Sequence, residues 1–107
     1  VLGIVENMAY FIPEDLPDNK YYIFGKEGAK GLAEQLEIEL LAQIPLVQSV
    51  REAADAGRPA VLQGSTPIAL ELLDMTKNIL ASINKRNTNL APTKAVELTN
   101  SKGCSTK

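Results

Sequence analysis

Asn7 is the residue of this sequence best suited to bind a ligand, because it comes just after the apolar run Val1–Val5. Such a run is typical of a strand buried on both faces of a parallel sheet. Open parallel sheets bind their ligands at the carboxyl ends of the strands. A carboxamide offers both a donor and an acceptor, so it can pair with the edge of a purine base. From its position alone, Asn7 either recognises a base or caps a loop.

A second candidate group follows the second apolar run, Leu40–Pro45. Proline cannot donate to a strand ladder, so Pro45 is expected to end this strand. Because parallel strands end at the same edge of a sheet, Pro45 and Leu46 would lie near Asn7. They are either a simple strand stop or a wall of the same pocket.

No catalytic motif is complete in the chain. It has neither of the two glycine-rich phosphate-binding patterns, no cluster of cysteines and no histidine. The stretch Gly25–Gly28 precedes an expected helix but places Glu27 where an anion would bind, so we interpret it as a helix entry. We therefore predict no catalytic residue and no metal ligand within this sequence.

The composition is that of one ordinary domain: 107 residues, 45% hydrophobic, with 11 basic and 13 acidic side chains. A net charge of −2 gives no case for binding nucleic acid. No apolar run reaches the ~18 residues that a membrane span needs, and no signal peptide is visible, so a cytoplasmic protein is expected. Residues 86–107 carry four basic groups and one acidic group, which predicts a flexible basic tail behind a domain of residues 1–85.

Hydrophobic spacing predicts the elements that position these residues. Thr66 and Pro67 have the types that cap and begin a helix, and Gly57 the type that closes one. The expected elements after the first strand are a short strand at Tyr21–Phe24, a helix at Glu27–Leu36, the strand Leu40–Pro45, a helix at Gln48–Ala56 and a long helix at Pro67–Lys85.

The expected inward faces of the helices follow from the same spacing. In the first helix they are Ala29, Leu32, Ala33 and Leu36, and in the long helix Ile68, Leu72, Met75, Ile79 and Ile83, with Leu73 and Leu80 widening the stripe. The order of elements predicts an α/β fold with a parallel βαβα unit. Two strands cover too little apolar surface to make a domain, and a chain rarely begins inside a buried strand, so we expect an incomplete sheet in a fragment of a longer protein.

Four segments in this order carry a family resemblance: Val1–Tyr10 (VLGIVENMAY), Tyr22–Gly25 (YIFG), Gln43–Leu46 (QIPL) and Arg51–Pro59 (REAADAGRP). Over residues 1 to 63 the chain resembles the C-terminal third of the Mrp/ApbC-type iron–sulfur cluster carrier ATPases. These form part of the MinD/ParA-like branch of P-loop NTPases.

The resemblance implies a doubly wound parallel sheet that binds ATP and Mg²⁺ and works as a homodimer. It implies that the phosphate loop and both magnesium-contacting segments lie upstream of Val1, so this segment is inactive alone while its parent is an ATPase. It assigns adenine recognition to Asn7, and it places Pro45, Leu46 and Val47 beside the base. The parent would deliver iron–sulfur clusters to acceptor apoproteins.

One departure from the family pattern concerns the cluster. Many members carry a Cys-x-x-Cys between the first two of these segments, whereas Phe11–Tyr21 contains no cysteine and the only thiol is Cys104. Fe–S clusters need several thiolates, so the usual cluster site is missing here. Two other functions remain open: a non-catalytic interaction module that recruits a partner through its sheet edge, and a partition or septum-positioning ATPase of the same branch.

Overall fold

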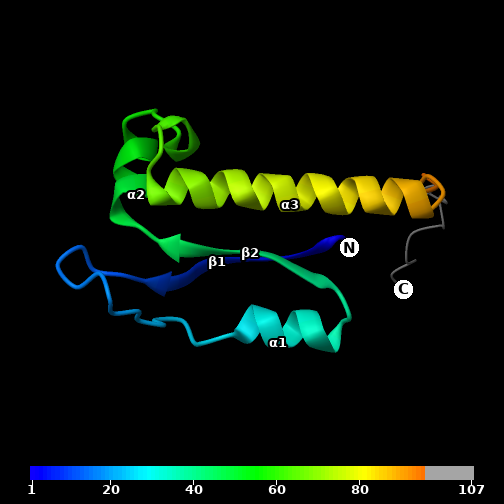
Figure 1. Ribbon diagram of the computed structural model, residues 1–107, viewed down its shortest axis with the longest axis horizontal. Helices are drawn as coiled ribbons and strands as arrows, with labels where there is room; N and C mark the ends of the chain where they lie inside the picture. The colour runs from blue at the N-terminus through cyan, green and yellow to red at the C-terminus, as the bar shows by residue number, and fades with distance from the viewer. Residues whose placement is uncertain (96–107) are drawn as a thin grey trace, which may run out of the picture.

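The computed structural model describes residues 1–95 and forms a layered α/β arrangement (Figure 1). Its elements are the strands β1 (Gly3–Phe11) and β2 (Glu39–Leu46), the helices α1 (Gly28–Gln35), α2 (Gln48–Asp55) and α3 (Pro67–Asn89), and the 3-10 turn η1 (Ala60–Leu62). The strands pair in parallel, with α1 on one side of them and α3 on the other. The predicted α/β fold with a parallel βαβα order is confirmed.

The first strand is longer than the apolar run that predicts it. It continues to Phe11 because Glu6 pairs with Gln43, and Asn7 with Ile44, in the parallel register. Asn7 therefore lies inside β1, and the prediction that it follows the end of the strand is wrong. The run of apolar residues ends at Val5, but the backbone hydrogen bonds of a strand can continue without apolar side chains.

Directly after Asn7 the strand is distorted. Met8 has a φ of 56°, in the left-handed region that non-glycine residues rarely adopt. The parallel pairing is interrupted there and resumes only where Phe11 meets Leu46. The regular pairing with β2 thus ends at Asn7, although β1 continues to Phe11. The backbone distortion at Met8 lies directly beside the Asn7 side chain.

The second strand and the segment before α1 also depart from expectation. β2 runs through Pro45 to Leu46 instead of ending at the proline. The predicted strand at Tyr21–Phe24 is wrong: only Tyr21 pairs, through an isolated antiparallel bridge to Phe11. The chain turns at once, with the N–H of Gly25 donating to the carbonyl of Tyr22 at 3.3 Å.

The predicted helix ends follow from local chemistry. The Thr66 hydroxyl accepts a hydrogen bond from the N–H of Ala69 at 3.3 Å, and Pro67 begins α3. Gly57, with a φ of +67°, follows α2 in the left-handed conformation of a C-terminal cap. α3 continues four residues beyond the expected Lys85. The predicted tail lies in part beyond the described residues, and Cys104 lies there entirely.

The core is small and made mostly of small side chains. The buried apolar residues of the described chain are Ala9, Ala33, Leu41, Ile44, Ala53, Ile68 and Ala69. The expected inward stripe of α3 is buried or half-buried along its length. However, Leu73 and Leu80 are exposed, as are Leu32 and Leu36 of the first helical segment, so those four assignments are wrong. With two strands there is no sheet wide enough to reach them.

The incomplete sheet shows in the exposure and dimensions of the chain. Val1, Leu2 and Val5, from the run expected to be buried on both faces, are exposed. The radius of gyration is 19.3 Å, against about 13 Å for a compact domain of this length. The incomplete parallel sheet that the sequence predicts is therefore present in the structure.

Candidate functional site

A hollow of about 320 Å³ opens at the edge where the strands' carboxyl ends lie, and we call it the carboxyl-edge hollow. It is lined by Asn7, Met8, Ile44, Pro45, Leu46, Val47, Val50, Arg51, Ala54, Ile68 and Leu72. All four residues predicted to form a site, Asn7, Pro45, Leu46 and Val47, lie together in its wall.

Each wall of the hollow comes from a different element. β1 and β2 supply the residues of the sheet, α2 begins at Gln48 directly after the strand, and the first two turns of α3 supply Ile68 and Leu72. α2 lies beside the carboxyl ends of the strands, next to the beginning of α3 (Figure 1). The hollow is therefore built by the return of the chain over its own sheet edge.

Asn7 carries unused hydrogen-bonding capacity in this hollow. Its Oδ1 accepts a hydrogen bond from the N–H of Met8 at 3.0 Å. Its Nδ2 has no partner among residues 1–95, and the side chain is exposed. The carboxamide is thus held from one side by the distorted backbone, while its donor group and the second lone pair of Oδ1 remain free for a ligand.

Glu6 fixes the same stretch of β1 from the opposite face. Its Oε2 accepts a hydrogen bond from Nε2 of Gln43 at 2.6 Å, and its Oε1 lies 3.5 Å from the N–H of Ala29 in the first turn of α1. Successive side chains of a strand point to opposite faces, so Glu6 faces α1 while Asn7 faces α3. Glu6 therefore positions the strand beside Asn7.

An aromatic and cationic cluster lies beyond Met8. The rings of Tyr10 and Tyr22 meet edge to face at 6.5 Å, and Nζ of Lys20 lies 4.0 Å from the centre of the Tyr10 ring. Burial raises the pKa of Tyr10, and the negative charge of Glu71 and the neighbouring Tyr22 raise it further. Tyr10 therefore stays protonated at neutral pH and acts as a packing residue.

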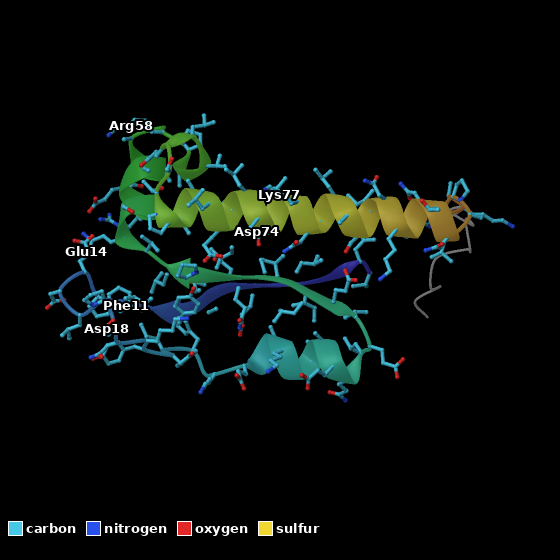
Figure 2. The ribbon with its side chains drawn as sticks, in the orientation of Figure 1. Phe11, Glu14, Asp18, Arg58, Asp74 and Lys77 are labelled. Carbon is cyan, nitrogen blue, oxygen red and sulfur yellow. The ribbon has the colours of Figure 1, made fainter. Side chains whose placement is uncertain are left out.

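The loop after β1 lies beyond the sheet edge. Figure 2 shows Phe11 at the end of the strand, with Glu14 and Asp18 on the loop that follows it. Phe11 also lines a second hollow of about 430 Å³, which fewer residues surround. It shares Leu46, Val47 and Arg51 with the first hollow. The two hollows therefore adjoin at the beginning of α2.

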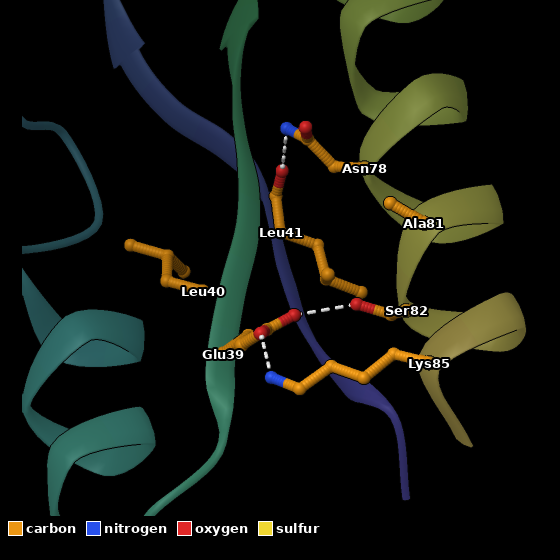
Figure 3. A pocket seen from close by; sticks show the side chains of 7 residues that line it. All are labelled: Glu39, Leu40, Leu41, Asn78, Ala81, Ser82 and Lys85. Atoms are coloured by element: carbon orange, nitrogen blue, oxygen red, sulfur yellow. Dashed lines mark hydrogen bonds and ion pairs between the residues drawn. The ribbon is translucent and has the colours of Figure 1, made fainter. Parts of the chain in front are cut away.

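A different hollow of about 410 Å³ lies between the amino end of β2 and the second half of α3, and we call it the amino-end hollow (Figure 3). Its polar side chains are all paired within the chain. Glu39 accepts from the hydroxyl of Ser82 and from Nζ of Lys85, and Nδ2 of Asn78 donates to the carbonyl of Leu41 at 2.9 Å. The hydrogen bond from Ser82 and then the charge and hydrogen bond of Lys85 lower the pKa of Glu39.

Neither a metal site nor a membrane span is found in the part of the chain that the structure describes. No three acidic, cysteine or histidine side chains there converge on a point that could hold a metal ion. Within residues 1–95 no helix is both long enough and apolar enough to cross a membrane.

Sequence reasoning misses seven of the eleven residues that line the carboxyl-edge hollow: Met8, Ile44, Val50, Arg51, Ala54, Ile68 and Leu72. Of these, Ile44 is expected only as part of a strand, and Ile68 and Leu72 only as core. Val50, Arg51 and Ala54 follow helical spacing after Val47, and this spacing is the signal that could have found them. The left-handed conformation of Met8 leaves no comparable signal in the sequence.

Comparisons with known proteins agree on one kind of relative. The model of the ParA family, described as NUBPL iron-transfer P-loop NTPase, matches residues 1–81. The iron–sulfur cluster carrier protein of Synechocystis is 42% identical over 85 residues, which cover 78% of this chain and 24% of that protein. The iron–sulfur cluster carrier protein of Saccharolobus solfataricus is 40% identical over 82 residues, which cover 75% of this chain and 27% of that protein.

A eukaryotic relative gives a similar match. The iron–sulfur cluster transfer protein NUBPL of Dictyostelium discoideum is 37% identical over 84 residues, covering 78% of this chain and 26% of that protein. The chain thus spans about a quarter of the length of the curated relatives it matches.

Proposed function

Because this chain belongs to the ParA family of NUBPL-like iron-transfer P-loop NTPases, we propose that its carboxyl-edge hollow is the adenine-side wall of an ATP site. Asn7 pairs with the edge of the base, and Pro45, Leu46 and Val47 flank it. The observation that supports this is the free Nδ2 of Asn7 at the rim of a mostly apolar hollow that gathers all four residues.

The chemistry of Asn7 suits adenine better than guanine. A carboxamide can accept from the 6-amino group of adenine while donating to a neighbouring ring nitrogen, and such paired contacts are worth about 1–3 kcal/mol of discrimination. Guanine presents a carbonyl oxygen in place of that amino group, which leaves Oδ1 of Asn7 facing another acceptor. The volume of the hollow, about 320 Å³, is at the lower end of the range for small-molecule sites, about 300–1,000 Å³.

The remaining parts of the nucleotide site belong to other segments of a complete protein. The chain has no phosphate-loop motif, and phosphates are normally held by such a loop, its Lys and Mg²⁺. We therefore propose that this chain does not hydrolyse ATP by itself. In a complete cytoplasmic homodimer, ATP binding and hydrolysis would drive the transfer of iron–sulfur clusters to acceptor apoproteins.

The cluster itself, the cargo of such a protein, does not fit the described residues. Clusters are held by cysteine thiolates, residues 1–95 contain no cysteine, and no other group of ligands converges there. The contribution of this segment is therefore to nucleotide recognition, and no step of cluster transfer is assigned to its residues.

Nucleoside binding to the ¹⁵N-labelled chain tests the proposal. Adenosine at millimolar concentration should shift the NMR signals of the Asn7 side-chain amide and the Met8 backbone amide. Asn7→Ala should weaken adenosine binding about tenfold, whereas Asn84→Ala, at the far end of α3, should leave it unchanged. Equal affinity for adenosine and guanosine, unaffected by Asn7→Ala, would contradict the role of Asn7. ATP should bind no more tightly than adenosine.

Exposed apolar side chains support a second function, that of an interaction module. Leu70, Leu73 and Leu80 lie exposed on α3. Within residues 1–95, β1 pairs along its length only with β2, apart from the isolated bridge of Phe11 to Tyr21. Unpaired strand edges and large apolar patches promote association with other chains. We expect the 107-residue chain to form a two-fold dimer through these surfaces, distinct from any ATP-dependent dimer. A well-folded monomer in sedimentation equilibrium at micromolar concentration would overturn this expectation.

A further inference from the structure

We propose that Arg51 covers the base in the carboxyl-edge hollow by stacking its planar guanidinium on the aromatic ring. The inference rests on the proposed function and adds to it a second residue that selects the ligand. Among the eleven residues that line the hollow, only Asn7 and Arg51 carry polar side chains. Pockets for small ligands typically combine apolar walls with a few such groups that fix orientation.

The two polar groups reach the hollow from different elements. Asn7 lies on β1. Arg51 extends from α2, whose residues Val50 and Ala54 line the same hollow. Arg51 also lines the adjoining hollow beside Phe11. Its side chain therefore stands at the boundary between the two depressions, where it can lie across a flat ligand whose edge is held by Asn7.

The charge of Arg51 is already balanced within the chain. One Nη lies 3.3 Å from Oδ2 of Asp55 and the other lies 3.8 Å from Oε1 of Glu52. The contact to Asp55 is a hydrogen bond, and guanidinium N–H groups lie in the plane of the group, so this carboxylate meets its edge. Most of the Arg51 side chain stays accessible. Two nearby negative charges oppose the binding of a phosphate, whereas an aromatic face is attracted by the cation.

The geometry therefore favours a base over an anion as the partner of Arg51. Guanidinium planes commonly stack on nucleobases. The exposed position of Arg51, whose side chain is 67% accessible, leaves it free to settle onto a ligand. Asp55 acts as a positioning residue, since it accepts a hydrogen bond from one end of the guanidinium.

NMR titration of the ¹⁵N-labelled chain with adenosine tests this role separately from that of Asn7. The Nε–H signal of Arg51 should shift together with the side-chain amide of Asn7. Arg51→Ala should weaken adenosine binding about threefold to tenfold. Arg51→Lys keeps the charge but not the plane, so it should weaken binding as much. Arg58→Ala is the control, because Arg58 lies on the far side of α2 and does not line the hollow (Figure 2).

Four results would overturn the proposal. If Asn7 responds to adenosine while Arg51 does not, or if Arg51→Lys binds as the unchanged chain does, stacking is wrong and the adenine site stands. If inorganic phosphate shifts the Arg51 signal as strongly as adenosine does, Arg51 is an anion contact instead. If neither Asn7 nor Arg51 responds, the proposed function fails and this inference fails with it.

Discussion

The two hollows at opposite ends of β2 are covered by the same helix, α3, but differ in how their polar side chains are satisfied. In the amino-end hollow, Glu39, Asn78, Ser82 and Lys85 all find partners within the chain (Figure 3). In the carboxyl-edge hollow, the Asn7 side chain keeps a free donor, and its only hydrogen bond within residues 1–95 is to the adjacent backbone.

This difference separates a structural site from a binding site. Paired polar groups stabilise the docking of α3 on β2, and a ligand entering there would have to break those pairs. A free amide at the rim of an apolar wall loses nothing when a ligand pairs with it. The larger of the two hollows is therefore the weaker candidate for ligand binding, because its donors and acceptors are already used.

The largest expected effect is the loss of stability when Ile68, in the wall of the carboxyl-edge hollow, is replaced. Ile68 is 7% exposed, so Ile68→Ala should lower the free energy of unfolding by about 2–4 kcal/mol through lost burial and a new cavity. Asn84→Ala, at an exposed position of α3, should change it by less than about 0.5 kcal/mol. Urea unfolding followed by circular dichroism measures both, and equal losses would mean that α3 does not pack as described.

The two asparagines provide the most direct test of the comparison. Asn78→Ala removes a hydrogen bond to the carbonyl of Leu41 and should lower the free energy of unfolding by about 1 kcal/mol. Asn7→Ala removes only an exposed contact to Met8 and should lower it by no more than a few tenths of a kcal/mol. The same urea experiment checks both changes. The opposite ranking would assign the structural role to Asn7.

The smallest effect concerns the pH dependence of the amino-end hollow. The pKa of Glu39 is lowered by the Ser82 hydroxyl and by Lys85, so its carboxylate is harder to protonate in the folded chain. Its stabilising contribution is fully present above the unfolded-state pKa and is lost as the pH falls through the folded-state pKa. Glu39→Gln should therefore make the acid-side loss of stability less steep.

Ser82→Ala gives a second measurement of the same pair. Removing the hydroxyl should raise the pKa of Glu39 toward its ordinary value, as followed by NMR titration of the carboxyl carbon. An identical midpoint in the unchanged chain and in Ser82→Ala would show that Ser82 does not stabilise the charged form. Glu39 does not line the carboxyl-edge hollow, so adenosine binding should not follow the titration of Glu39.

The ends of α2 and α3 could be predicted from the sequence, but the extent of β1 could not. Thr66, Pro67 and Gly57 act through bonds to residues within a few positions, so their types are sufficient to locate helix ends. β1 passes its apolar run because Glu6 meets Gln43, which lies 37 residues further along the chain. Such pairing depends on the register between the two strands, and the apolar content of a segment does not indicate that register.

Apart from the strand wrongly predicted at Tyr21–Phe24, the sequence by itself determined the order of the main elements, the α/β class and the family, since these follow from periodicity and from short motifs. It also pointed to Asn7, Pro45, Leu46 and Val47, although it placed Asn7 beyond the strand. The tertiary structure alone decided which side chains share a hollow and which polar groups remain free. The Ser82 hydroxyl donates a hydrogen bond to Glu39, 43 residues earlier in the chain. Within residues 1–95, the Asn7 side chain is hydrogen-bonded only to its neighbour Met8. The reason is physical: a hydrogen bond depends on distances in space, which local sequence does not specify.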